Sequence, residues 1–278
     1  MALSPEGLRK SVANHYGERV RPVLDSVELE VPMAAAASCC GSESSASCCG
    51  PENETHASTC CGDAPSETID RITALYEEFD LAGLPESVTS VAFGCGNPTA
   101  IDALRPGETV LDLGSGGRID CFLAAKMVGP TGRVIGVDMT PEMIALANRN
   151  LARVGATNIE FRHGQIEELP IDSESVDVII SNCVINLSTD KDSVFREAFR
   201  VLAPGGRFQV SDIVWTREPD DAMKSDAEAW AGCIAGALGE QDFLERLRAA
   251  GFTEVRSVAA GYSGRQGIAS AQITAVKP

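Results

Sequence analysis

The stretch 109-TVLDLGSGGRIDCFLAA-125 gives the strongest indication of the fold of this chain. It predicts a strand over 109–113, then a glycine-rich turn and the start of a helix. A second strand is expected over 133–139. Strand, glycine turn, helix and strand form one βαβ unit, in which Asp112 stands just before the turn and Asp138 closes the second strand. Such a unit suits a ligand that contains a nucleoside.

The glycine pattern separates the classes of nucleoside ligand. A nicotinamide-binding turn follows the pattern G-x-G-x-x-G, and Ile119 stands here in place of its third glycine. The chain has no Gly-Lys-Ser or Gly-Lys-Thr motif, so a nucleoside triphosphate has no support. An acid just before the turn suits a ligand with an amino-acid end. Asp112 can face its ammonium group, N–H groups of the turn and the helix start can face its carboxylate, and Asp138 can accept hydrogen bonds from both ribose hydroxyls.

This combination resembles the class I S-adenosylmethionine (SAM) methyltransferases. The resemblance implies that SAM is held by Asp112, Gly114, Ser115 and Gly116 at its methionine end, by Asp138 at the ribose, by Met139, Ile166 and Glu167 at the adenine, and by Asn182 near the transferred methyl group. For Met139 and Ile166, ordinary core packing is the competing interpretation. An ordinary tight turn between strand and helix is the competing interpretation of the glycine stretch.

Beyond the central unit, strands and helices keep alternating. Strands are expected at 158–164, 176–182, 206–214, 252–258 and 269–276, and helices at 67–80, 141–153, 190–202 and about 240–250. The alternation predicts an α/β fold with a doubly wound, mostly parallel, Rossmann-like sheet. Ligands of such a sheet bind at the carboxyl ends of its strands.

The N-terminal part has a different composition. Residues 4–17 predict a short amphipathic helix, and 27–31 alternate like a strand. Residues 33–66 contain no Ile, Leu, Val, Phe, Tyr or Trp, so we expect a flexible segment. This segment carries three vicinal cysteine pairs: Cys39 and Cys40, Cys48 and Cys49, Cys60 and Cys61. Their spacing does not match a zinc ribbon, and zinc, another thiophilic ion, a thiol–disulfide relay and incidental cysteines all stay open.

Three single cysteines fall where a ligand at the strand ends can sit. Cys183 follows the fourth strand in SNCVINL, Cys95 lies between two glycines in GCGNP, and Cys233 lies in CIAGA. Cys121, inside an apolar helix, is expected to be a small core residue. With the glycine turn, these motifs resemble the arsenite methyltransferases over residues 67 to about 240.

The resemblance implies that Cys95, Cys183 and Cys233 hold trivalent arsenic, with SAM as methyl donor. It also implies that an N-terminal cysteine pairs with the one in the glycine loop, and six candidates stand in the repeated pairs. Soft arsenic prefers thiolates, and its lone pair attacks without losing a proton, so no general base is needed. Methylation oxidises arsenic, which makes a thiol reductant such as thioredoxin or glutathione an expected partner. Arg118 replaces a glycine of many relatives. If the backbone there is helical, the side chain is tolerated and can even favour the ligand carboxylate; if that position needs a positive φ, SAM binding is weaker.

Composition bounds the partners and the location. A net charge of −17 over 278 residues argues against nucleic acid or an anionic membrane as partner. No run of 18 apolar residues occurs, so no membrane span is predicted. The N-terminus lacks the apolar stretch of a signal peptide. Ten cysteines without such a peptide indicate reduced thiols and a cytoplasmic protein.

Four parts are therefore expected: 1–32 with a helix and a strand, the flexible cysteine-rich segment 33–66, a SAM-binding methyltransferase domain with the arsenic site over 67–240, and 241–278 with a helix and strands. Two other functions compete with arsenite methylation. A SAM enzyme that methylates carbon or oxygen of a small molecule, such as a quinone, would share the fold but needs no thiols. A non-catalytic thiol-rich protein that binds metal or arsenic would not need Asp112 and Asp138.

Overall fold

The computed structural model describes residues 4–28, 84–89, 96–100, 104–117, 119–217, 226–261 and 267–278. The cysteine-rich segment 33–66, the helix expected at 67–80, Cys95 and Arg118 lie outside these ranges.

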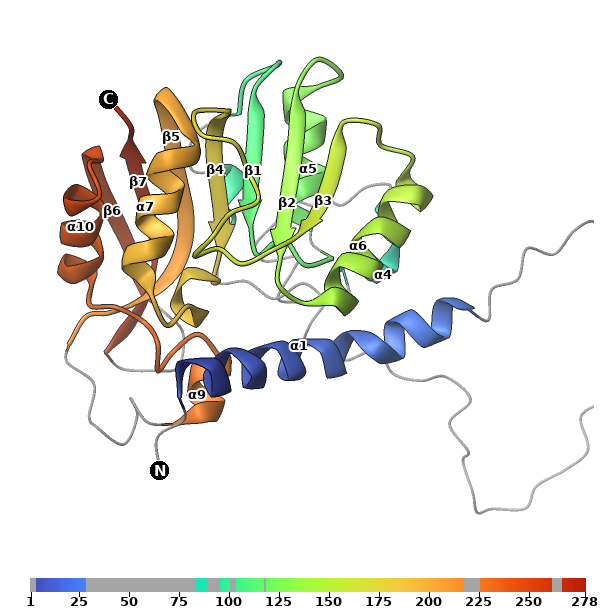
Figure 1. The fold of residues 1–278 in the computed structure, drawn as a ribbon, viewed down its shortest axis with the longest axis horizontal. Coiled ribbons are helices and arrows are strands. Elements are labelled where there is room, and N and C mark those ends of the chain that lie inside the picture. Colours follow the sequence, from blue (N-terminus) through green and yellow to red (C-terminus); the bar gives the residue numbers. More distant parts are fainter. Residues whose placement is uncertain are drawn as a thin grey trace, which may run out of the picture.

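One seven-stranded sheet organises the described residues (Figure 1). Its strands are β1 (Thr109–Leu113), β2 (Arg133–Asp138), β3 (Ile159–His163), β4 (Val176–Asn182), β5 (Leu202–Trp215), β6 (Thr253–Gly261) and β7 (Ile268–Val276). They lie in the order β3-β2-β1-β4-β5-β7-β6. Strands β1 to β5 pair in parallel, and β7 runs antiparallel to both β5 and β6. The predicted α/β fold with a mostly parallel, doubly wound sheet is confirmed, and the strand order reverses direction between β1 and β4.

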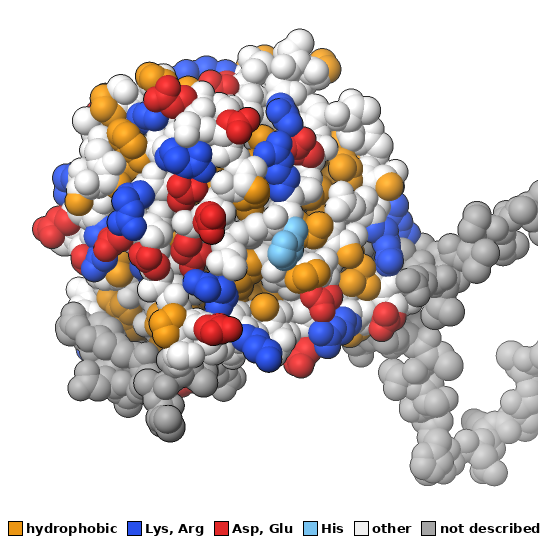
Figure 2. Space-filling view, viewed as in Figure 1, with side chains coloured by type: hydrophobic (Ala, Val, Ile, Leu, Met, Phe, Trp, Pro, Cys, Tyr) orange, Lys and Arg blue, Asp and Glu red, His pale blue; other side chains and the backbone are white. Residues whose placement is uncertain are grey.

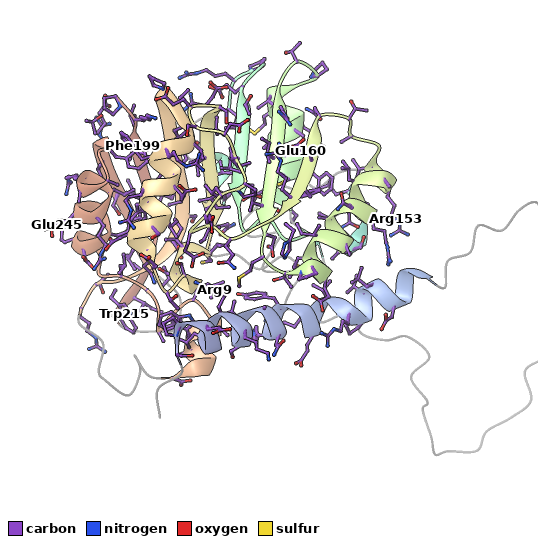
Figure 3. All side chains as sticks on the ribbon, in the orientation of Figure 1. Arg9, Arg153, Glu160, Phe199, Trp215 and Glu245 are labelled. Atoms are coloured by element: carbon purple, nitrogen blue, oxygen red, sulfur yellow. The ribbon has the colours of Figure 1, made fainter. Side chains whose placement is uncertain are left out.

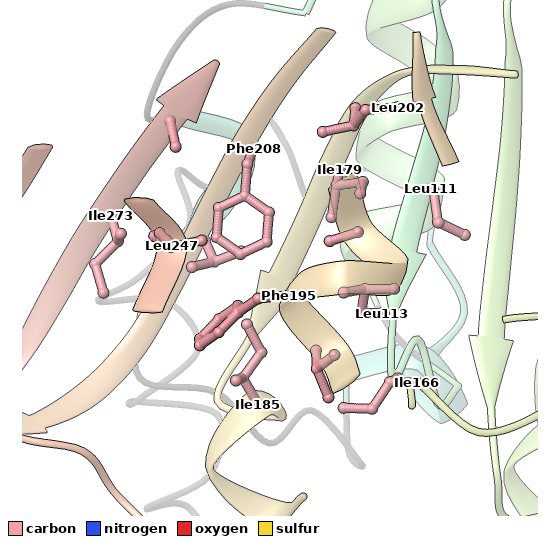
Figure 4. Close-up of a cluster of buried hydrophobic side chains, with 14 of the residues drawn as sticks. Leu111, Leu113, Ile166, Ile179, Ile185, Phe195, Leu202, Phe208, Leu247 and Ile273 are labelled. Atoms are coloured by element: carbon pink, nitrogen blue, oxygen red, sulfur yellow. The ribbon is translucent and has the colours of Figure 1, made fainter. Parts of the chain in front are cut away.

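The central strands bury both faces of the sheet because their side chains alternate between two cores. Leu111 and Ile179 belong to the larger core, which α7 (Lys191–Val201) and α10 (Glu240–Ala249) cover. Figure 4 shows this core, with Phe195 of α7 beside Phe208 of β5. Val110 belongs to the second core, against α5 (Ile119–Val128). The nearly continuous apolar run of β4 is therefore explained by burial on two sides.

Strand β5 begins at Leu202, four residues before the predicted start at 206. Leu202 pairs with Val176 of β4, and the register then shifts before Val178 pairs with Arg207. The turn at Pro204 and Gly205 thus lies within the strand as an irregularity, where the sequence pattern places a boundary.

Helix α1 (Pro5–Glu28) lies across the edge of the sheet where the parallel strands end (Figure 1). It is longer than predicted, and the strand expected over 27–31 is wrong for residues 27 and 28, which are helical; 29–31 lie outside the described ranges. Val20 packs on Met143 and Leu146 of α6 (Pro141–Val154). This packing stabilises the helix beyond its first turns. Because helix propagation is cooperative, the strand-like alternation that begins at residue 27 does not end the helix there.

The remaining described helices are short: α4 (Glu86–Thr89), α9 (Ala227–Ala231), and the 3₁₀ turns η1 (Pro98–Ala100) and η2 (Ile185–Leu187). On the face in Figure 2, charged side chains of both signs lie interspersed over α7 and α10. Arg246 of α10, for example, pairs with Asp192 of α7 at 2.9 Å. Among the residues that the structure describes, no helix has both the length and the apolar character needed to cross a bilayer.

Candidate functional site

A cavity opens at the carboxyl ends of the central strands, where the strand order reverses. It contains about 630 Å³ of empty space, counting the open solvent at its mouth. Its floor is the turn after β1 and the end of β2, and α1 closes one side. Its lining residues are Arg9, Val12, Tyr16, Gly114, Gly116, Asp138, Met139, Thr140, Met143, Gly164, Ile166, Glu167, Val184, Leu187 and Ser188.

Most of the residues predicted to hold the cofactor line this cavity. They are Gly114, Gly116, Asp138, Met139, Ile166 and Glu167. The other three, Asp112, Ser115 and Asn182, are buried and do not contribute to the lining. Asp112 accepts a hydrogen bond from the Cys121 thiol at 3.2 Å. Cys121 has no exposed surface, as expected for a small core residue, and its bond to Asp112 was not foreseen.

The turn after β1 is held by its own backbone. The N–H groups of Gly114 and Ser115 donate to the carbonyl of Val137 at 2.8 and 3.0 Å, and the N–H of Gly116 donates to Asp138 Oδ2 at 2.9 Å. The prediction that N–H groups of the turn face a ligand carboxylate is therefore wrong for these three groups. The acceptors of all three hydrogen bonds, the Val137 carbonyl and Asp138 Oδ2, lie at the adjacent end of β2.

Gly114 brings this turn into direct contact with the segment after β4. Its φ of +68° lies in the left-handed region that glycine favours. A Cβ atom there would collide with the methyl groups of Val184 and would lie 2.9 Å from Val184 Cβ. Because Val184 follows Cys183, the cavity and Cys183 share a wall.

Helix α1 supplies the side of the cavity that sequence reasoning missed. Arg9, labelled in Figure 3, lies 3.7 Å from Glu167, which also accepts a hydrogen bond from Ser188 at 2.7 Å. The Tyr16 hydroxyl donates to the carbonyl of Ala231 at 3.1 Å and lies 4.0 Å from Cys233 Sγ. The only signal in the sequence is an apolar stripe at helical spacing, which does not distinguish a cavity wall from core.

Two of the three predicted arsenic ligands meet in the structure. Cys183 follows β4 and Cys233 follows α9, and the Cys233 thiol donates to the carbonyl of Cys183 at 2.7 Å. Both are buried, in a cluster that includes Trp215 at the end of β5 (Figure 3). Cys95 and the six cysteines of the repeated pairs lie outside the described ranges. Within those ranges, no three His, Cys, Asp or Glu side chains are grouped to hold a metal ion.

Both cysteines have an unusual backbone conformation. Cys183 has a φ of +57° and Cys233 a φ of +62°; among the described residues, only Glu174 and Glu254 also combine a side chain with a positive φ. Such a conformation costs on the order of 1 kcal/mol, and it persists where the surroundings determine it and often where function requires it. Cys233 forms no disulfide, whereas Cys183 is disulfide-bonded, so the expectation of reduced thiols is wrong at Cys183.

Two buried ionisable groups, Lys191 and Asp212, contact the segment that follows Cys183. Burial lowers the pKa of Lys191 to about 8, while the charge of Asp212 opposes this change. Lys191 Nζ donates to the carbonyl of Ser188 at 2.8 Å and lies 5.4 Å from the centre of the Trp230 ring. Burial raises the pKa of Asp212 to about 7, although the N–H of Ile213 donates to its carboxylate at 2.9 Å.

The raised pKa of Asp212 predicts a pH effect on stability. Because its pKa in the folded protein exceeds its ordinary value of 3.8, this group contributes stability that is complete below about pH 4 and is lost as the pH rises toward 7. In Asp212→Asn that loss is absent. The free energy of unfolding of the variant minus that of the parent should therefore increase by about 1.4 kcal/mol for each pH unit between about 4 and 7. Urea unfolding at pH 5 and pH 7 measures this, and a difference that does not change with pH would contradict it.

The sequence and the fold are similar to those of known methyltransferases. The model of a methyltransferase domain family matches residues 104–251. An arsenite methyltransferase from Halobacterium salinarum is 49% identical over 70% of the chain, and one from Aquipseudomonas alcaligenes is 45% identical over 64% of the chain. The chain covers 50% and 53% of these two proteins, and so spans about half the length of the curated relatives it matches. The crystal structure of an arsenic(III) S-adenosylmethionine methyltransferase from Chlamydomonas reinhardtii is similar with a TM-score of 0.63 and 38% identity, over 72% of each chain.

Proposed function

Because the chain belongs to the methyltransferase family and, within it, to the arsenic(III) S-adenosylmethionine methyltransferases, we propose that it transfers a methyl group from SAM to trivalent arsenic. The observation that carries this proposal is the contact of Cys233 with Cys183, whose neighbour in the chain lines the cavity. The Cys233 thiol lies 2.7 Å from the Cys183 carbonyl oxygen, and the next residue, Val184, lines the cavity. Cys95 is proposed as the third arsenic ligand from its sequence motif.

The cavity fits a nucleoside with an amino-acid end. Gly114 and Gly116 line the cavity without side chains, and both have a positive φ. Asp138 stands at the cavity with a carboxylate that is held by the N–H groups of Gly116 and Thr140 at 2.9 and 2.8 Å. We assign the ribose hydroxyls to this carboxylate, because each of its oxygens keeps a further lone pair. Met139 and Ile166 supply apolar surface for the base, and Asp112 is proposed to act at the methionine end from its buried position.

In this proposal the protein contributes thiolates and position. SAM, when bound, supplies an electrophilic methyl group with a neutral thioether leaving group. Thiolates of Cys95, Cys183 and Cys233 hold the soft arsenic and leave its lone pair free to form the new bond to carbon. No proton leaves the arsenic, so the site needs no general base. The shared wall between the cavity and Cys183 brings the two reactants together, which is a large part of catalysis in a two-substrate reaction.

The cycle also needs electrons. Forming the arsenic–carbon bond raises arsenic formally from +3 to +5, and a dithiol that becomes a disulfide returns the two electrons. We propose thioredoxin or glutathione as the source, and a reducing cytoplasm as the compartment. Because Cys183 is disulfide-bonded in the structure, reduction must also precede arsenic binding at that residue.

Methyl transfer from labelled SAM to arsenite tests the proposal. With excess thiol, we expect methylated arsenic to accumulate; without a reductant, we expect turnover to stop, because Cys183 then offers no thiolate. Binding of SAM without transfer to arsenite would contradict the proposal and would favour a methyltransferase of carbon or oxygen in a small molecule. Arsenite binding without SAM binding would favour a thiol-rich binding protein.

A further inference from the structure

The motif SNCVINL has an asparagine on each side of Cys183, and the two side chains reach different segments of the chain. We propose that Asn182 and Asn186 are positioning residues: Asn186 holds the loop of Cys233 beside Cys183, and Asn182 holds Gly96 beside it, so that these segments are ordered before arsenic binds. This inference rests on the proposed function and deepens it.

Asn186 holds the loop of Cys233. Its side chain is fully buried in η2, and Nδ2 donates to the carbonyls of Ile213 at 2.7 Å and Cys233 at 3.1 Å. The amide thus ties the backbone of Cys233 to strand β5. Gly236 packs against the same asparagine, because a Cβ atom there would collide with the carbonyl oxygen of Asn186.

Within the described part of the chain, the orientation of the Asn186 amide leaves one buried atom without a hydrogen bond, which destabilises the folded state. Among the described residues, Asn186 Oδ1 is buried without a hydrogen-bond partner. A buried acceptor that lacks a donor destabilises the folded state. The amide keeps this orientation because its nitrogen reaches two backbone carbonyls, and one of them belongs to Cys233.

Asn182 holds Gly96 in the corresponding way. Its Nδ2 donates to the carbonyl of Gly96 at 2.7 Å and lies 3.4 Å from Asp120 Oδ2. Gly96 directly follows Cys95 in the sequence. It packs on Ser211 of β5, where a Cβ atom would collide with Oγ and lie 2.9 Å from Cβ. The carbonyl of Ser211 accepts the N–H of Cys183 at 2.8 Å, so the Gly96 loop and Cys183 contact the same residue.

The two contacts have a direct consequence for binding. A site that must order three separate loops around one atom loses binding free energy to that ordering, and a site ordered beforehand does not. Removing one asparagine should therefore weaken arsenite binding while the cofactor cavity, which neither side chain lines, keeps its shape.

Asn158 provides a matched control. Its Nδ2 also donates to two backbone carbonyls, those of Ala125 at 3.1 Å and Gly129 at 2.9 Å. Asn158 precedes β3, away from the carboxyl ends of the strands. Asn158→Ala removes the same kind of contact without touching a cysteine loop.

The experiment measures arsenite binding to the full chain, reduced with a phosphine so that no other thiol competes, for the parent, Asn186→Ala and Asn158→Ala. SAM affinity is measured on the same samples. We expect Asn186→Ala to bind arsenite about tenfold more weakly than the parent, as the loss of one or two buried hydrogen bonds implies. We expect SAM affinity to stay within about twofold and Asn158→Ala to bind arsenite as the parent does. If Asn186→Ala does not fold, Asn186→Ser provides the same test, because its hydroxyl keeps a buried polar group but has a single hydrogen to donate to two carbonyls.

The outcomes separate this inference from the proposed function. Arsenite affinity of the folded asparagine variant within about twofold of Asn158→Ala would overturn the positioning role alone. Equal losses of arsenite and SAM affinity would also overturn it, because they would indicate a general structural role. Failure of the parent itself to bind arsenite would overturn the proposed function and this inference together.

Discussion

Replacing Cys183 with serine is expected to lower kcat/KM for arsenite by at least about a hundredfold, since a neutral hydroxyl is a poor ligand for soft arsenic. Serine is nearly the same size and keeps the same backbone at a φ of +57°. The N–H of residue 183 keeps its bond to the carbonyl of Ser211. With excess thiol, which also reduces the disulfide of Cys183 in the parent, the variant should fold and bind SAM like the parent, so that the loss is confined to the arsenic.

Cys121→Ser is the matched control for this substitution. Cys121 is also buried, and a serine hydroxyl can replace its thiol as donor to Asp112. We expect this variant to keep at least about half of the parent activity, because no arsenic ligand is lost. Methyl transfer with excess thiol compares the variants, and equal activity of Cys183→Ser and Cys121→Ser would exclude a role for Cys183 as arsenic ligand.

Replacing Gly114 with alanine is expected to damage the cofactor cavity and the cysteine loop together. The new methyl group would collide with Val184, which lines the cavity and follows Cys183. Because the obstacle is a partly buried β-branched side chain whose Cβ itself lies 2.9 Å from the new atom, the backbone after Cys183 must move. We expect SAM affinity to fall at least about tenfold and the free energy of unfolding to fall by about 2–4 kcal/mol, the sum of a left-handed alanine and an overpacked contact.

Gly129→Ala separates the two contributions. Gly129 has the same φ of +68° as Gly114, but a Cβ atom there meets nothing within 4 Å. This control should lose only about 1–2 kcal/mol for the backbone conformation and no SAM affinity. Urea unfolding and calorimetric titration with SAM measure both quantities. Similar results for the two alanine variants would show that Val184 does not constrain the cavity.

The fold was largely predictable from local patterns. Strand β4 has the predicted bounds, and the helix at 141–153 differs from α6 by one residue. These elements are set by apolar runs, helical spacing and turn residues, which act over a few positions of the chain. Where a pattern was short, as over 27–31, packing of α1 on α6 prevailed at residues 27 and 28.

The site was predictable in part. Gly114, Gly116 and Asp138 line the cavity as expected, because a residue at the end of a parallel strand is at the sheet edge whatever the rest of the chain does. The hydrogen bonds of the turn to Val137 and the contact of Asn182 with Gly96 were not foreseen. Each depends on which carbonyl of another segment lies nearest.

Local sequence patterns are sufficient to predict the succession of strands and helices along the chain, the glycine turn and the position of Cys183 at the end of a strand, because these follow from interactions between neighbouring residues. The tertiary contacts could not be predicted in this way. The Cys233 thiol, 50 positions later in the chain, donates to the carbonyl of Cys183, and Tyr16 of α1 lies 4.0 Å from the Cys233 sulfur. Such contacts depend on how whole elements pack across the sheet edge, and the spacing of residues along the chain does not contain that information.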